Sequence, residues 1–120
     1  MAKIERFEDL QSWQKARQLC MQVFDLTERG SFARDYELRN QIRGASGSIM
    51  HNVAEGFDAG SDAEFTRFLK IARRSASEVQ SQLYLALDRK YIAQHDLDTV
   101  YETATEIKKL INGLIAYLQK

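Results

Sequence analysis

Basic side chains at helical spacing are the residues of this sequence with the clearest chemistry. Four of them fall between positions 67 and 74, most within one face of a helix, and two more are stacked four residues apart at positions 39 and 43. Cations gathered on one surface bind the phosphates of nucleic acids. If the two segments are neighbouring helices, they form one patch of six cations: Arg39, Arg43, Arg67, Lys70, Arg73 and Arg74.

Signatures of catalysis and metal binding are missing. The histidines are His51 and His95, and neither follows an acidic residue by three positions, as the di-metal sites of ferritin-like bundles require. Ser46 lacks the later glycine and the preceding strand of a nucleophile elbow. His51 and Glu55 share a helix face, which leaves an enzyme built on this pair as the remaining catalytic alternative. We therefore predict no enzyme activity, no cofactor and no bound metal.

A second motif ends the earlier of the two basic segments. Asn52 and Glu55 lie three residues apart, on one side of a last helical turn that Gly56 would end. A carboxylate near a helix C-terminus opposes the helix dipole, so Glu55 needs a compensating partner, either Arg43 or donors at the start of the next helix. We interpret Asn52, Glu55 and Gly56 as a structural motif that holds the loop at 56–60, with a catalytic carboxylate as the alternative.

These side chains need helices to position them, and apolar residues at a period near 3.6 predict four. Asp35 and Ser61 are suitable N-caps, Ser61 within a capping box with Glu64, and Gly30 is a suitable stop. The predicted helices span residues 7–28, 35–55, 61–90 and 96–118. Short connections favour an antiparallel up-down-up-down four-helix bundle, an all-α fold with a single domain over 1–120.

The composition is typical of a globular cytoplasmic protein. Hydrophobic residues make up 44% of the chain, which supports a packed core and excludes disorder. The single cysteine, Cys20, excludes an internal disulfide. The N-terminal residues lack a signal sequence, and no apolar run is long enough to span a membrane. The 17 basic and 17 acidic side chains balance, which is unlike most nucleic-acid-binding proteins.

Two further features favour self-association. The run Gly44-Ala45-Ser46-Gly47-Ser48 lies inside a predicted helix, where two glycines cost about 2 kcal/mol of helix propensity. Small side chains let another helix approach closely, either within the bundle or between subunits. Numerous aromatic residues, with Phe68 and Ile71 widening the apolar face of the third helix, indicate either an oligomer contact or a thick core.

Several segments together resemble a known family. They are Phe7-Glu8-Asp9-Leu10, Gln41-Ile42-Arg43, Asn52-Val53-Ala54-Glu55-Gly56 and Phe65-Thr66-Arg67-Phe68-Leu69. Their order resembles the bacterial four-helix bundle proteins associated with intervening sequences in 23S ribosomal RNA genes. The resemblance implies a homopentamer. It also implies similarity in fold to the accessory variability determinant of diversity-generating retroelements, a pentamer that binds nucleic acid and a reverse transcriptase.

The residues and the resemblance together predict a non-enzymatic homo-oligomer, a pentamer by the resemblance. We expect it to bind RNA, or DNA, through the six-cation patch. The alternative is a scaffold that binds a protein partner and has no role with nucleic acid. No membrane partner is expected.

Overall fold

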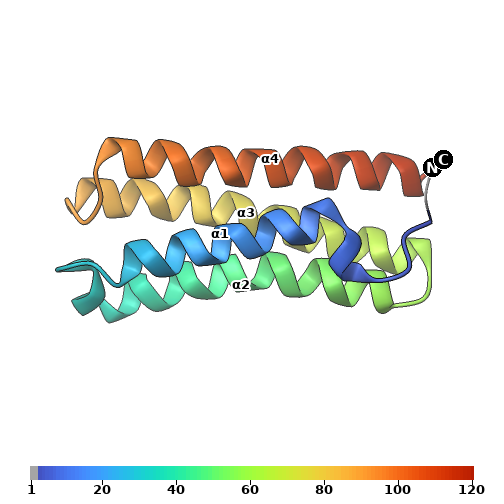
Figure 1. Cartoon of the computed structure of the whole chain (residues 1–120), viewed down its shortest axis with the longest axis horizontal. Helices are drawn as coiled ribbons and strands as arrows, with labels where there is room; N and C mark the ends of the chain where they lie inside the picture. The colour runs from blue at the N-terminus through green and yellow to red at the C-terminus, as the bar shows by residue number, and fades with distance from the viewer. Residues whose placement is uncertain (1–2) are drawn as a thin grey trace.

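Four long helices account for most of the chain in the computed structural model, which describes residues 3–120. Two short 3-10 turns, η1 (Phe7–Asp9) and η2 (Phe32–Arg34), precede the first and second helices. The long helices are α1 (Gln11–Thr27), α2 (Tyr36–Asp58), α3 (Asp62–Asp88) and α4 (Gln94–Leu118). They alternate in direction along a rod of 45 × 22 × 19 Å, and both ends of the chain lie at one end of it (Figure 1). The predicted all-α, up-down-up-down four-helix bundle is confirmed.

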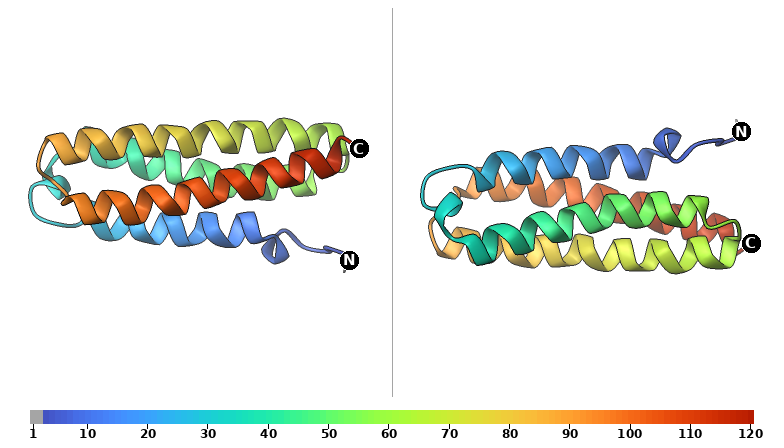
Figure 2. Two further views of the ribbon diagram at one scale, coloured as in Figure 1. Left: turned by 90° about the horizontal axis from the view of Figure 1, so that it is seen from above. Right: turned by 90° about the horizontal axis from the view of Figure 1, so that it is seen from below.

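Each helix packs against two neighbours, an arrangement that the views from above and below make visible (Figure 2). The neighbouring pairs are α1–α2, α2–α3, α3–α4 and α4–α1, so α1 lies diagonally across from α3. All four helices contribute fully buried side chains to one core, among them Leu19, Ile49, Leu69 and Ile107. Burial of each such side chain contributes roughly 1.5–3 kcal/mol. Over residues 3–120, the structure has no helix long and apolar enough to cross a membrane.

The helix boundaries differ from the predicted ones by more than two residues in two places. The first predicted helix, 7–28, is divided, because Leu10 has an extended backbone between η1 and α1. The second is predicted to end at residue 55 with Gly56 as its stop, but α2 continues to Asp58 and Gly56 is buried inside it. Gly56 serves packing rather than helix termination, since Phe65 and Phe68 of α3 approach its backbone closely.

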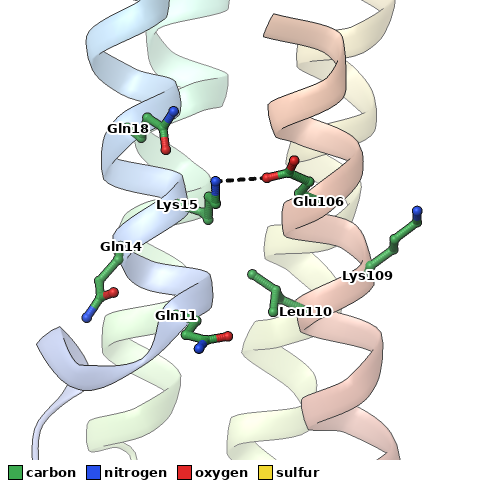
Figure 3. A pocket seen from close by; sticks show the side chains of 7 residues that line it. All are labelled: Gln11, Gln14, Lys15, Gln18, Glu106, Lys109 and Leu110. Carbon is green, nitrogen blue, oxygen red and sulfur yellow. Dashed lines mark ion pairs between the residues drawn. The ribbon is translucent and has the colours of Figure 1, made fainter. Parts of the chain in front are cut away.

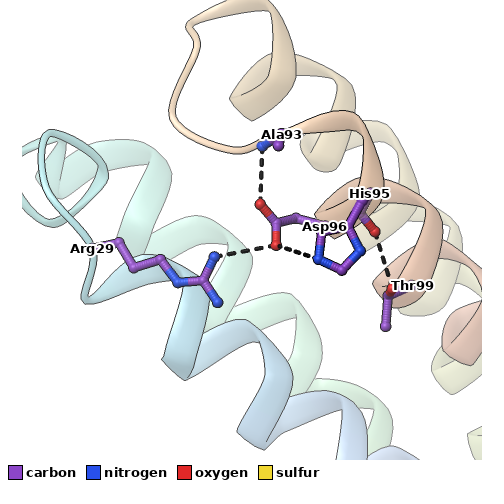
Figure 4. A network of polar contacts seen from close by, with 5 residues as sticks. All are labelled: Arg29, Ala93, His95, Asp96 and Thr99. Atoms are coloured by element: carbon purple, nitrogen blue, oxygen red, sulfur yellow. Dashed lines mark hydrogen bonds and ion pairs between the residues drawn. The ribbon is translucent and has the colours of Figure 1, made fainter.

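Carboxylates cap two of the helices. At the start of α2, Asp35 accepts a hydrogen bond from the Leu38 backbone N–H at 3.1 Å, as predicted for an N-cap. At the start of α4, Asp96 accepts from the Ala93 N–H at 2.9 Å and from the Arg29 guanidinium at 3.1 Å (Figure 4). The backbone N–H groups favour the ionised carboxylates, so the pKa of Asp35 and the pKa of Asp96 are lowered from their ordinary values.

Acid is expected to destabilise the bundle through these two carboxylates. Folding lowers the pKa of both carboxylates, so each adds to the free energy of unfolding at any pH above its unfolded pKa, about 3.9. This added stability is lost as the pH falls through the pKa of the folded state. The free energy of unfolding, measured by urea denaturation, should therefore be smaller at pH 2.5 than at pH 7. In the double variant Asp35→Asn/Asp96→Asn this difference should shrink, because neither group then titrates. An unchanged difference would contradict the assignment.

Candidate nucleic-acid interface

The two cations of α2 face α1 and the segment that follows it. Arg43 Nε donates a hydrogen bond to Thr27 Oγ1 at 2.8 Å, and its guanidinium lies over the Phe24 ring, 4.4 Å from the centroid. Arg39 donates to the Ala33 carbonyl at 2.9 Å. Both arginines are half-buried. Arg43 therefore links α2 to α1 and is not a free surface cation.

Three of the cations of α3 are exposed on its outer face: Arg67, Lys70 and Arg74. Arg67 pairs with Glu64, with 2.8 Å between its Nε and a carboxylate oxygen. The predicted capping box is accordingly half formed, because Ser61 Oγ accepts from the Glu64 N–H at 3.2 Å while the Glu64 carboxylate turns to Arg67. Lys70 and Arg74 form no ion pair within residues 3–120. They are available to an external anion.

The six cations do not form one patch, contrary to the sequence prediction. A 2.9 Å contact between the Ser48 and Ser75 hydroxyls sets the register of the antiparallel pair α2–α3. In this register Arg39 lies opposite about residue 84 of α3, roughly 25 Å along the axis from Arg67 at 1.5 Å per residue. Arg43 also turns toward α1, away from α3. The role of these residues in binding stays a prediction.

A basic surface forms instead between α3 and α4. Arg73 reaches α4, where its Nη1 donates to Asn112 Oδ1 at 2.8 Å. Lys108 reaches α3, where its Nζ donates to Gln80 Oε1 at 3.1 Å. Lys109 is exposed on the outer face of α4, at the edge of a groove between α4 and α1, and its side chain extends away from α1 (Figure 3). We give the name α3–α4 basic surface to five cations, two that bridge this seam and three on the exposed faces of α3 and α4 beside it: Arg73, Lys108, Lys70, Arg74 and Lys109.

These five cations lie at one level of the bundle. Thr105 Oγ1 accepts from Gln80 Nε2 at 3.0 Å, and together with the Arg73–Asn112 contact this places the two lysines of α4 opposite residues 76–77 of α3. The five positions therefore fall within about 10 Å along the axis. None of them forms an ion pair with a carboxylate in the part of the chain that the structure describes.

Lys108 and Lys109 are the members that the sequence prediction missed. Their signal is present, because helical spacing places Lys108 on one face with Tyr101 and Asn112, which is the face that meets α3. The spacing becomes informative only once α3 and α4 are known to be neighbours. The lysines then extend the basic stretch of α3 sideways onto a second helix.

Charges of opposite sign are largely separated along this side of the molecule, with Glu78, one turn after Arg74, as an exposed carboxylate beside the basic residues. The exposed carboxylates of Asp88, Asp98 and Glu102 gather where α3 ends and α4 begins, at the end of the rod away from the chain termini. The α3–α4 basic surface occupies the middle and the part nearer the termini. The net charge of the whole chain is zero, but within this region the five cations outnumber the carboxylate of Glu78, and this local excess favours phosphate binding.

A family model described as 23S rRNA-intervening sequence protein matches residues 8–113. The chain belongs to this family. A solved structure from Bacteroides thetaiotaomicron, described as a protein of unknown function from the S23 ribosomal protein family, has a TM-score of 0.78 and 26% sequence identity; the match covers 88% of this chain and 95% of the other. No curated protein matches the chain. The family predicted from the sequence motifs is confirmed.

In this member of the family, the motif around Asn52 ties α2 to α3. Asn52 Nδ2 donates to the Ser48 carbonyl at 2.8 Å and to Ser48 Oγ at 3.0 Å, and the same hydroxyl contacts Ser75 of α3. Glu55 is exposed and forms no ion pair within residues 3–120. Its predicted partner Arg43 is bonded to α1 instead. The predicted bond to the loop at 56–60 is not formed by Asn52, whose amide bonds to Ser48 within α2 and so supports the Ser48–Ser75 contact. Neither of the partners expected for Glu55, Arg43 or donors at the start of α3, bonds to its carboxylate within residues 3–120.

A groove of about 590 Å³ lies between α1 and α4, on the side of α4 away from α3 (Figure 3). Its lining includes Gln11, Gln14 and Gln18 of α1. Across it, Lys15 Nζ and a Glu106 carboxylate oxygen lie 2.9 Å apart. The residues that line this groove offer hydrogen bonds and one ion pair but no histidine, cysteine or serine nucleophile. The basic surface is therefore the better candidate for function.

Proposed function

We propose that the protein is a non-enzymatic, self-associating four-helix bundle of the cytoplasm that binds RNA through the α3–α4 basic surface. One observation carries the proposal: five cations gather at one level of the bundle, and none of them has an ion-pair partner within residues 3–120. Such a surface attracts phosphates, and each phosphate that a cation neutralises releases condensed counterions from the nucleic acid.

Self-association is supported by two glycines of α2, Gly44 and Gly47, which packing within the single bundle does not require. A Cβ at Gly44 would meet no atom within 4 Å, and one at Gly47 would meet only the His51 side chain of the same helix, at 3.8 Å. Together the two glycines cost the helix about 2 kcal/mol. Close approach of a second copy to α2 would account for them. In the pentamer that the resemblance implies, symmetry would repeat the basic surface and raise its avidity.

Binding to labelled structured RNA, and to duplex DNA for comparison, tests the proposal by fluorescence anisotropy at two salt concentrations. We expect sub-micromolar RNA binding that weakens steeply with salt. If all five cations engage phosphates, the logarithm of the affinity should fall with the logarithm of the salt concentration with a slope of about −3.5 to −4.5. Absence of binding to both probes at low salt would contradict the proposal.

A protein-interaction scaffold is the second candidate function. Large apolar side chains are exposed on α1 and α3: Met21, Phe24, Tyr84 and Leu85. Met21 is 61% exposed and Leu85 is 53% exposed, so neither side chain belongs to the core of the single bundle. Exposed apolar side chains of this size are typical of a surface that contacts another protein. A pulldown that returns one stoichiometric protein after nuclease treatment would favour this function over RNA binding.

A further inference from the structure

We infer that the RNA bound here carries unpaired bases, and that one of them stacks on Tyr117 near the end of α4. The inference rests on the proposed RNA binding and adds the class of RNA. Tyr117 is 57% exposed, and Lys120 Nζ lies 5.9 Å from the centroid of its ring. The ring borders the open cleft between the start of α1, the α2–α3 loop and the end of α4. The lining of this cleft includes Leu114 and Leu118 and also two carboxylates, Asp9 and Asp62. A flat apolar ring is thus presented to solvent beside a cation.

Tyr117 belongs to a strip along the outside of α4. Lys109, Gly113 and Tyr117 are exposed at intervals of four residues, so they lie on successive turns of α4, and the exposed Lys120 follows just after the helix. The strip begins at Lys109, on the outer edge of the α3–α4 basic surface, and runs from there toward the side of α4 that faces the start of α1. Lys109 and Tyr117 are about 12 Å apart along α4, and Lys120 lies on the other side of the ring, beyond the end of the helix.

Gly113 leaves room for a strand to approach α4 between Lys109 and the ring. A Cβ at this position would meet no atom within 4 Å, so packing within the chain does not require the glycine. In a helix interior the glycine costs about 1 kcal/mol relative to alanine. A bare stretch of helix backbone between a cation and an aromatic ring fits a nucleotide that contacts both.

Positive side chains and an exposed ring are the two parts of a surface for single-stranded nucleic acid. Cations follow the backbone, while aromatic side chains stack on bases, which present a flat face whatever their identity. In a duplex the bases are already stacked inside the helix and cannot reach a side chain. Proteins that recognise RNA by its bases therefore bind loops, bulges and single strands. The strip on α4 predicts the same preference here.

A second exposed tyrosine offers a matched control. Tyr84 of α3 is 51% exposed, close to the value for Tyr117, and its ring packs edge-to-face against Tyr101 at 6.1 Å. It lies in the acidic part of this side, with Asp88 one turn further along α3 and Glu102 beside Tyr101. Within residues 3–120 no cation lies over the Tyr84 ring, whereas Lys120 lies over that of Tyr117, so a strand held by cations should pass over Tyr117 and not over Tyr84.

The test compares a labelled single-stranded RNA of ten nucleotides with an RNA duplex of the same length, by fluorescence anisotropy at low salt. Tyr117→Ala should weaken binding of the single strand about 5- to 160-fold, which corresponds to the loss of about 1–3 kcal/mol when a base loses its aromatic partner. Tyr117→Phe should bind like the parent protein, because the ring is kept. Tyr84→Ala should change neither affinity, and the duplex should be indifferent to all three variants. Circular dichroism checks that each variant is folded.

The outcomes separate this inference from the proposed function. If the parent protein binds both probes and Tyr117→Ala keeps its affinity for the single strand, the stacking role is overturned while RNA binding stands. Equal losses in Tyr117→Ala and Tyr84→Ala would also overturn it, because they would show no preference for the basic strip. If neither probe binds at low salt, the proposed function fails and the inference fails with it.

Discussion

Replacing Lys70 and Arg74 by glutamate is expected to weaken RNA binding about tenfold or more at moderate salt, because two phosphate contacts become repulsive. Both side chains are exposed on successive turns of α3, and neither forms an ion pair within residues 3–120. Their reversal should therefore leave the bundle folded. Arg67 is a poorer target, since Glu64 already pairs with it at 2.8 Å.

The control for this experiment reverses two cations elsewhere. Arg34 in η2 and Lys90 after α3 are exposed, and both lie at the end of the rod away from the chain termini. Arg34→Glu/Lys90→Glu changes the net charge by the same amount, yet it should retain most of the affinity. In Lys70→Glu/Arg74→Glu the salt slope should also become shallower by about two. Equal affinities in the two double variants would remove the α3–α4 basic surface as the binding site.

Gly56→Ala is expected to reduce the free energy of unfolding by about 1–3 kcal/mol, the usual cost of overfilling a packed interior. A Cβ at this position would lie 2.7 Å from the Phe68 Cβ and 3.0 Å from Phe65 Cδ1. The Phe68 Cβ is fixed to the backbone of α3, so rotation of the side chain cannot relieve the contact and the two helices must separate. The gain in helix propensity, about 1 kcal/mol, offsets part of this cost.

Gly44→Ala is the matched substitution for this measurement. Gly44 lies in the same helix, but a Cβ there would meet nothing within 4 Å, so alanine should stabilise the monomer by about 1 kcal/mol. Thermal unfolding of both variants should place their midpoints on opposite sides of the parent value, each shifted by about 4 °C per kcal/mol. A Gly56→Ala variant as stable as the parent would mean that α3 moves away from α2 at no cost.

Gly44→Ala also bears on self-association. If a second copy packs against the outer side of α2, the added methyl group should shift the assembly toward monomer even as it stabilises the single bundle. Sedimentation velocity over a range of concentrations would measure this shift. An unchanged distribution of species would show that Gly44 is outside the subunit contact.

Most of the architecture was predictable, because it rests on interactions that are local in the chain. Apolar residues at a period of 3.6 determine which side of each helix is buried, and residues such as Leu69 and Ile107 are indeed fully buried. The N-cap at Asp35 and the positive φ of Gly30 depend only on residues within a few positions. For the same reason the family could be identified from short segments.

The candidate site was predictable only in part, because the side chains on its margins are positioned by neighbours far away in the chain. Helical spacing correctly predicts that Arg67, Lys70 and Arg74 share an outer face, but it does not show that Arg43 bonds to Thr27. Likewise a glycine at the end of a run of helix looks like a stop until a second helix is known to press on it, as α3 does on Gly56.

Local periodicity determined the four helices and their buried faces, because each residue's direction around its own helix axis follows from its position in the chain. Tertiary structure alone decided that α3 lies beside α4 in the register of Arg73 and Asn112, and so that Lys108 and Lys109 join the basic surface. The physical reason is that these contacts join residues nearly thirty to forty positions apart. Only packing of the whole core sets their alignment, since no spacing within one helix encodes it.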